Sequence, residues 1–146
     1  HKGCGIAVIC FAVFLAVSPF VLLYLITRPP AGFHKGLYTE VTGRPYPASA
    51  KVIEKAGSSG LNTDYGYAAL IKVDTAEYQA ALQAMMNCGY RRDTTFHAGV
   101  DGYNILRKAC VEESAFNQRF SAGGTHQKII AFHCNGQVIF VEKFRY

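Results

Sequence analysis

The feature that most constrains this chain is residues 5–27, GIAVICFAVFLAVSPFVLLYLIT, which contain no charged side chain. The hydrocarbon core of a bilayer is roughly 30 Å thick, and about 20 apolar residues in a helix cross it. A lone segment inside lipid satisfies its backbone hydrogen bonds only as a helix. The sequence therefore predicts a transmembrane anchor over residues 1–27, with the lipid bilayer as its surroundings.

A cleaved signal peptide is the alternative interpretation of this stretch, because it also begins with a basic residue and an apolar run. Ala16-Val17-Ser18 has the small-x-small form of a cleavage site. Pro19 would follow the cut, however, and the apolar run continues well beyond the usual length of about 7–15 residues. We therefore favour an uncleaved anchor.

Small residues recur one helical turn apart in this segment, at Gly3 and Ala7 and again at Ala12 and Ala16. Such pairs let two membrane helices approach closely, so we expect these positions to pack against a helix of another membrane protein. The alternative is that they are only the small residues common in membrane helices. Pro19 cannot donate a backbone hydrogen bond to the preceding turn, so it is predicted to kink the helix.

The sequence indicates the orientation of the anchor in the membrane less directly. More basic residues follow the apolar stretch than precede it, and the positive-inside rule taken literally would place the following domain in the cytoplasm. The N-terminal position of the anchor and the cysteines of the domain favour the opposite side. We therefore expect an extracytoplasmic, periplasmic domain.

Three of the five cysteines lie beyond the anchor, at Cys88, Cys110 and Cys134. Three cysteines allow three different single disulfides, and the sequence does not choose among them. A Cys88–Cys110 bridge is one possibility, because it would join the end of a predicted helix to the segment that follows. The alternative is that all three are small buried apolar residues.

The rest of the chain is long enough for one domain and too short for two. Residues 28–48 are rich in Pro, Gly and Thr and are predicted to form a stalk. Residues 49–146 are predicted to form an α+β domain. Within it, residues 65–73 alternate between two faces, as a half-buried strand does, and residues 51–55 are expected to pair with them as a hairpin.

A helix is predicted over residues 75–88. Asp74 and Glu77 have the spacing of a capping pair, and apolar residues then recur at intervals of three and four. The following stretch is less clear: residues 90–103 carry no assignable pattern, residues 104–111 fit either a strand or a helix, and residues 112–121 are a helix candidate.

Strands over residues 128–134 and 137–146 flank Asn135-Gly136, which is typical of a two-residue type I′ hairpin turn. Both faces of these strands carry apolar residues, so the hairpin is expected to be central or covered on both sides. The order strand–strand–helix–mixed–strand–strand predicts one antiparallel sheet with one or two helices packed on one face.

Motifs that carry chemistry are sparse. The chain has no zinc-binding spacing, no phosphate-binding loop and no nucleophile elbow, and His133 and Cys134 would point to opposite faces of a strand. The formal net charge is +5, of which residues 29–146 carry +3, a mild and scattered charge that disfavours nucleic-acid binding. We assign no catalytic, cofactor or metal residue. Catalysis would require His97, His126 or Cys110 to converge in one cleft.

These features predict a single-pass, membrane-anchored protein that binds another protein and is not an enzyme. We expect an accessory or assembly subunit of a larger membrane protein complex. The alternative is an anchored periplasmic immunity or inhibitor protein that neutralises a toxin or an enzyme. The layout resembles small bacterial membrane-anchored accessory and immunity proteins in architecture alone.

Overall fold

The computed structural model describes residues 2–27, 29–59, 65–95 and 97–145, without the side chains of residues 2–9, 26, 27 and 59. Its strands are β1 (Lys51–Ser59), β2 (Tyr65–Lys72), β3 (Arg91–Arg92), β4 (Phe116–Ala122), β5 (Gln127–His133) and β6 (Val138–Arg145). Its helices are α1 (Lys2–Thr27), α2 (Phe33–Thr42), α3 (Thr75–Asn87) and α4 (Val100–Lys108), with a short 3-10 turn, η1 (Glu113–Ala115).

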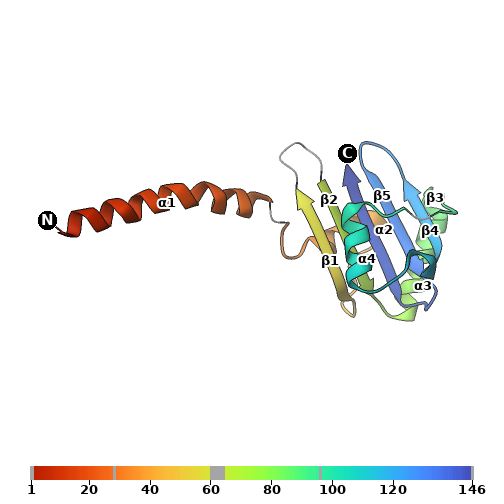
Figure 1. Ribbon diagram of the computed structural model, residues 1–146. Helices are drawn as coiled ribbons and strands as arrows, with labels where there is room; N and C mark the ends of the chain where they lie inside the picture. The colour runs from red at the N-terminus through yellow and green to blue at the C-terminus, as the bar shows by residue number, and fades with distance from the viewer. Residues whose placement is uncertain (1, 28, 60–64, 96, 146) are drawn as a thin grey trace.

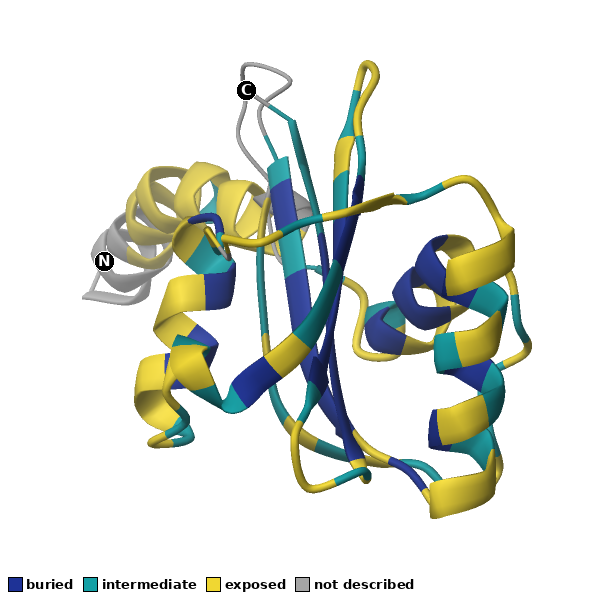
Figure 2. Ribbon diagram, turned by 90° about the vertical axis from the view of Figure 1, so that its right-hand side faces the viewer, coloured by how far each residue is buried: buried dark blue, intermediate teal, exposed yellow. Residues whose placement is uncertain are grey.

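The six strands form one antiparallel sheet in the order β1-β2-β6-β5-β4-β3. The predicted α+β class with an antiparallel sheet is therefore confirmed. The helices, however, lie on both faces rather than one: α2 and α3 cover one side, and α4 covers the other (Figure 2). Helix α1 extends away from the domain (Figure 1).

Two cores result from this arrangement. The first core lies under α2 and α3 and contains Ala69, Ile71 and Val73 of the β2 segment, while the second core, under α4, contains Ala68 and Leu70. The alternation read from the sequence of β2 is thus confirmed, with both faces buried. The final hairpin is also covered on both sides, as expected.

Helix α3 follows its sequence signals closely. Asp74 caps it by accepting a 2.8 Å hydrogen bond from the backbone N–H of Glu77. Tyr78, Ala81 and Met85 form the buried stripe. The predicted range of 75–88 is confirmed to within one residue.

Helix α2 lies inside the segment that the sequence predicts to be a stalk. Its buried side chains include Leu37, Tyr38 and Val41, which belong to the first core. Gly43, with a φ of 69°, ends it in the left-handed conformation. The helix has only 10 residues between flanks rich in Pro and Gly, so its apolar stripe is too short to stand out in the sequence.

Residues 112–121 form η1 and β4 instead of the predicted helix. Phe116 and Phe120, four positions apart, satisfy a helical period and a strand period equally well. A register shift between Phe116 and Gln118 places the two rings in different cores, Phe116 in the second and Phe120 in the first. The ambiguous residues 104–111 contribute to helix α4.

The loop between β5 and β6 is longer than a two-residue type I′ turn. Of Asn135 and Gly136, only Gly136 has a positive φ, 72°, whereas a type I′ turn needs both. The side-chain oxygen of Asn135 instead accepts hydrogen bonds from the N–H groups of Gln137 and Val138 at 3.0 and 3.2 Å.

Helix α1 runs unbroken through Pro19. The hydroxyl of Ser18 lies 3.5 Å from the Leu15 carbonyl, the group that Pro19 leaves without a backbone donor. Among the described residues, no helix combines the length and the apolar character needed to cross a membrane. The predicted membrane-spanning helix is thus not supported by the structure of these residues.

Candidate functional site: a cleft beside helix α4

A cleft of about 370 Å³ lies on the face of the sheet that carries α4. Helix α4 packs chiefly over β1 and β2 and leaves the far half of this face to the segment between β3 and α4. The cleft is lined by Arg91, Asp93, Thr95, His97, Ala98, Arg119, Phe120, Ser121, Gln127, Ile129 and Phe144.

The floor of the cleft comes from three neighbouring strands. Ser121 of β4 stands opposite Ile129 of β5, and Gln127 of β5 stands opposite Phe144 of β6. Opposed residues of antiparallel strands share one face, so these four side chains lie together. The floor is therefore half apolar and half hydrogen-bonding.

Arg119 holds the beginning of the wall, which is formed by residues 93–95, 97 and 98. Its Nη1 donates to the carbonyl of Thr94 at 3.0 Å, and its backbone carbonyl accepts from the N–H of Asp93 at 2.9 Å. Its Nε and Nη2 donate to the carbonyls of Phe116 and Glu113 at 2.7 and 3.3 Å. The guanidinium thus fixes the wall through backbone contacts.

Glu142 holds the end of the wall. This residue of β6 is fully buried, and its carboxylate accepts hydrogen bonds from the N–H groups of Gly99 and Gly102 at 2.8 and 2.9 Å. A Cβ atom at either glycine would lie 2.7–2.8 Å from a carboxylate oxygen, so neither position has room for a side chain. Burial raises the pKa of Glu142 to about 7, and the two N–H donors oppose that rise.

Several hydrogen-bonding groups at the cleft remain uncommitted. The side chains of Thr95, His97, Ser121 and Gln127 make no hydrogen bond to any described residue. The Nε of Arg91 bonds Asp93 at 2.9 Å, but its two terminal nitrogens have no partner among the described residues. The cleft therefore presents donors and acceptors from two sides, around an apolar patch.

The structure brings only one of the three conditional catalytic residues to this cleft. His97 lines it, whereas Cys110 follows α4 and His126 bonds Tyr65 through Nδ1 at 3.1 Å, and neither lines the cleft. Within the described residues, no cluster of three or more His, Cys, Asp or Glu could hold a metal ion. The sequence left residues 90–103 unassigned, so it gave no signal for the wall.

The predicted helix-packing positions on α1 are only partly described. Ala12 and Ala16 are exposed, and the side-chain surroundings of Gly3 and Ala7 lie outside the described part. Large apolar side chains of α1 are 42–72% exposed: Phe11, Val13, Phe14, Leu15, Val17, Phe20, Val21, Leu22, Leu23, Tyr24 and Leu25. The packing of the small residues against another helix stays a prediction.

Cys88 and Cys110 do not form the suggested disulfide in the structure, where both are free and exposed. Cys88 lies at the end of α3 and Cys110 follows α4, and these helices cover opposite faces of the sheet. Cys134 is likewise free and exposed.

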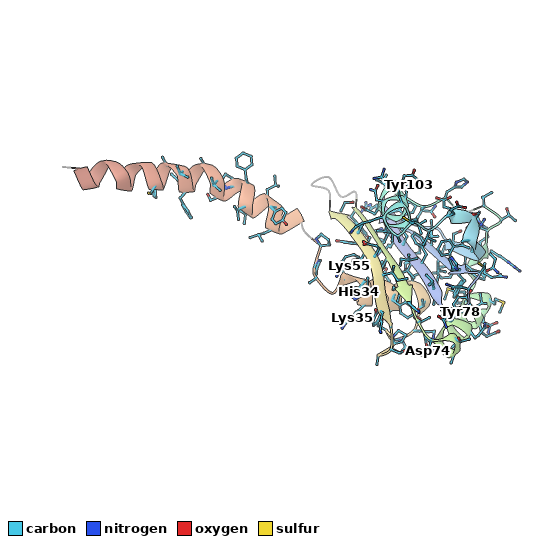
Figure 3. The ribbon with its side chains drawn as sticks, turned by 60° about the horizontal axis from the view of Figure 1, so that its bottom comes forward. His34, Lys35, Lys55, Asp74, Tyr78 and Tyr103 are labelled. Carbon is cyan, nitrogen blue, oxygen red and sulfur yellow. The ribbon has the colours of Figure 1, made fainter. Side chains whose placement is uncertain are left out.

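A second hollow, of about 350 Å³, lies at the start of α2 and is lined in part by His34 and Tyr46. His34 is 9% exposed, and its Nδ1 has no hydrogen-bond partner in the part of the chain that the structure describes. Figure 3 shows His34 near Lys35 and Lys55, on the side of the domain nearest α1. Burial, then Lys55 and Lys35, lower the pKa of His34, so the neutral ring is favoured.

Comparisons with models of protein families, with curated proteins and with solved structures found no match to this chain.

Proposed function

We propose that this chain is a single-pass, membrane-anchored protein that binds another protein and serves as an accessory or assembly subunit of a membrane complex. In this proposal the whole of residues 1–27 forms the anchor. The domain on the sheet provides the binding surface and carries out no reaction of its own.

The exposed apolar surface of α1 is the observation that carries this proposal. The consecutive residues 20–25 alone cover every side of the helix, and their large side chains are exposed. A helix that is apolar all round is stable where lipid or other apolar helices surround it, and contact with water is unfavourable. Residues 2–9 and 26–27, whose side chains are not described, are part of the same helix.

The test is extraction of the full chain in a mild detergent, followed by identification of the proteins that co-purify. In the variant A12L/A16L, added bulk should prevent close helix approach and reduce the co-purifying partner at least several-fold. The variant V13L/V17L is the matched control, because it adds bulk at the same spacing on an adjacent side of α1. Equal recovery from both variants would contradict packing through the small residues.

The side of the membrane is tested with the exposed thiols. If the domain is periplasmic, as we propose, a membrane-impermeant maleimide added to spheroplasts should label Cys88, Cys110 and Cys134. A variant with these three cysteines replaced by serine is the control. Labelling only after the membrane is disrupted would place the domain in the cytoplasm instead.

Replacement of residues 1–27 by an unrelated anchor separates the subunit from the inhibitor alternative. A subunit that packs through its own helix should lose its partner, whereas an inhibitor should keep binding through its domain. Recovery of the same partner with the foreign anchor would therefore reject packing through α1.

A further inference from the structure

We propose that the cleft beside α4 binds a carboxylate group presented by an acidic segment of the partner protein. This inference rests on the proposed protein-binding function and names the chemistry of its binding site. It is argued from the charge at the cleft, from its uncommitted donors and from the shape of its rim.

The charges at the cleft favour an anion. Two of the lining residues, Arg91 and Arg119, carry a permanent positive charge, and Asp93 is the single carboxylate among them. Arg91 bonds Asp93 through Nε alone, which leaves its terminal nitrogens available, and its side chain is 81% exposed. A guanidinium in this position can bind a second carboxylate through its two terminal nitrogens.

The uncommitted groups on the floor complete a site for such a ligand. Ser121 is the register partner of Arg91, so both side chains lie on the same face of the sheet. The Ser121 hydroxyl and the Gln127 amide can each donate to a carboxylate oxygen. Ile129 and Phe144 lie beside them and can contact the methylene groups of a glutamate or aspartate side chain.

The rim favours a side chain from a larger molecule. Thr95, His97 and Gln127 are exposed, so the cleft opens along its edge toward solvent. A protein segment can place one acidic side chain in the cleft while its backbone continues across this rim. Both ends of the wall are held, by Arg119 and by Glu142, so the site is largely formed before the ligand arrives.

The chain offers a matched pair of variants for the test. Arg92 is adjacent to Arg91 in β3, so its side chain lies on the opposite face of the strand, and Arg92 does not line the cleft. R91Q and R92Q remove the same charge from opposite faces of a short exposed strand. A general effect of net charge would weaken binding equally in both variants.

The experiment is an NMR titration of the full chain in detergent micelles with three probes. These are the peptide acetyl-Ala-Glu-Ala-amide, its neutral counterpart acetyl-Ala-Gln-Ala-amide, and succinate. We expect the glutamate peptide to shift the amide resonances of Ser121 and Gln127 in a saturable way, and the glutamine peptide to leave them unchanged. R91Q should lower the affinity for the glutamate peptide at least about tenfold, because a charge-assisted hydrogen bond is lost. R92Q should retain the binding.

Three results would overturn the proposal. The first is the absence of saturable shifts at the cleft with the glutamate peptide. The second is equal weakening in R91Q and R92Q. The third is tighter binding of succinate than of the peptide, which would assign the cleft to a small free acid. None of these results depends on whether α1 enters a membrane, so the proposal for the anchor and the proposal for the cleft can be rejected independently.

Discussion

At the scale of single residues, Glu142 is a carboxylate in unusual surroundings. It is fully buried in β6, and its partners are two backbone N–H groups near the beginning of α4. Burial disfavours the carboxylate, whereas the N–H donors and the helix N-terminus favour it. Burial is the larger effect, because the pKa is raised from 4.5 to about 7.

This raised pKa predicts a specific dependence of stability on pH. Between about pH 4.5 and 7 the folded chain holds a proton on Glu142 that the unfolded chain has lost, so the free energy of unfolding should fall as pH rises. The loss from this residue is at most about 3 kcal/mol and levels off above pH 7. Denaturant unfolding of the wild type and of E142Q at pH 5, 6, 7 and 8 measures it.

The acids with lowered pKa, Glu40, Asp74 and Glu77, provide a contrast at lower pH. Their contribution to stability is lost as pH falls below 4.5, which is the opposite direction, and E142Q leaves it in place. The expected result is therefore a difference between wild type and variant that grows from pH 5 to pH 7. Parallel curves would show that Glu142 does not titrate in this window.

At the scale of elements, α2 and α3 are joined through Glu77. The Tyr38 hydroxyl donates to Oε1 at 2.6 Å, and Arg44 donates from Nε to Oε1 and from Nη2 to Oε2 at 3.0 and 2.9 Å. The same Glu77 supplies the N–H that Asp74 caps. One residue in the first turn of α3 thus fixes both the start of that helix and its contact with α2.

These elements show which parts of the fold the sequence can predict. Strand β2, helix α3 and the final hairpin carry periodic patterns that are local, so the sequence reveals them. Helix α2 is too short, and the spacing of Phe116 and Phe120 fits two periods. In the sequence, Gly99 and Gly102 look like helix breakers. The sequence does not show that their N–H groups bond Glu142, because Glu142 is some 40 residues away.

The candidate cleft could not be predicted from the sequence either, because its residues are far apart along the chain. Its residues come from β3, β4, β5, β6 and the wall, and only the register of four strands brings them together. Arg119 could not be recognised, because its side-chain partners are backbone carbonyls. Of the residues that the sequence singled out for chemistry, His97 alone lines the cleft.

Two helical glycines give a prediction at this scale. In G102A the new methyl group would lie 2.7 Å from both Glu142 oxygens and from a Phe140 ring carbon, so we expect a loss of about 1–3 kcal/mol of stability. In α2, G36A meets nothing within 4 Å and should gain about 0.5–1 kcal/mol from helix propensity. Chemical denaturation of both variants measures the difference, and destabilisation of similar size in both would refute the close contact at Gly102.

At the scale of the whole molecule, the two cores and the apolar helix are separate. Every residue of both cores lies beyond residue 32, and α1 extends away from the sheet (Figure 1). The linker still contacts the domain, since Lys55 donates to the carbonyl of Ala31 at 2.5 Å. The stability of the sheet should therefore be independent of whatever surrounds α1.

This separation predicts that a chain of residues 29–146 folds by itself. We expect the truncated chain to unfold cooperatively, with a free energy of unfolding within about 1 kcal/mol of that of the full chain in detergent. Circular dichroism and denaturant titration provide the measurement. A truncated chain without a cooperative transition would show that α1 is part of the folding unit.

The position of β6 has a consequence for synthesis. Strand β6 lies in the middle of the sheet, between β2 and β5, so each of these two strands lacks one of its two partners until residues 138–145 have been made. A nascent chain on the ribosome would expose two unpaired strand edges and the apolar faces beside them until β6 has emerged. A premature stop before Val138 would therefore yield an aggregation-prone fragment.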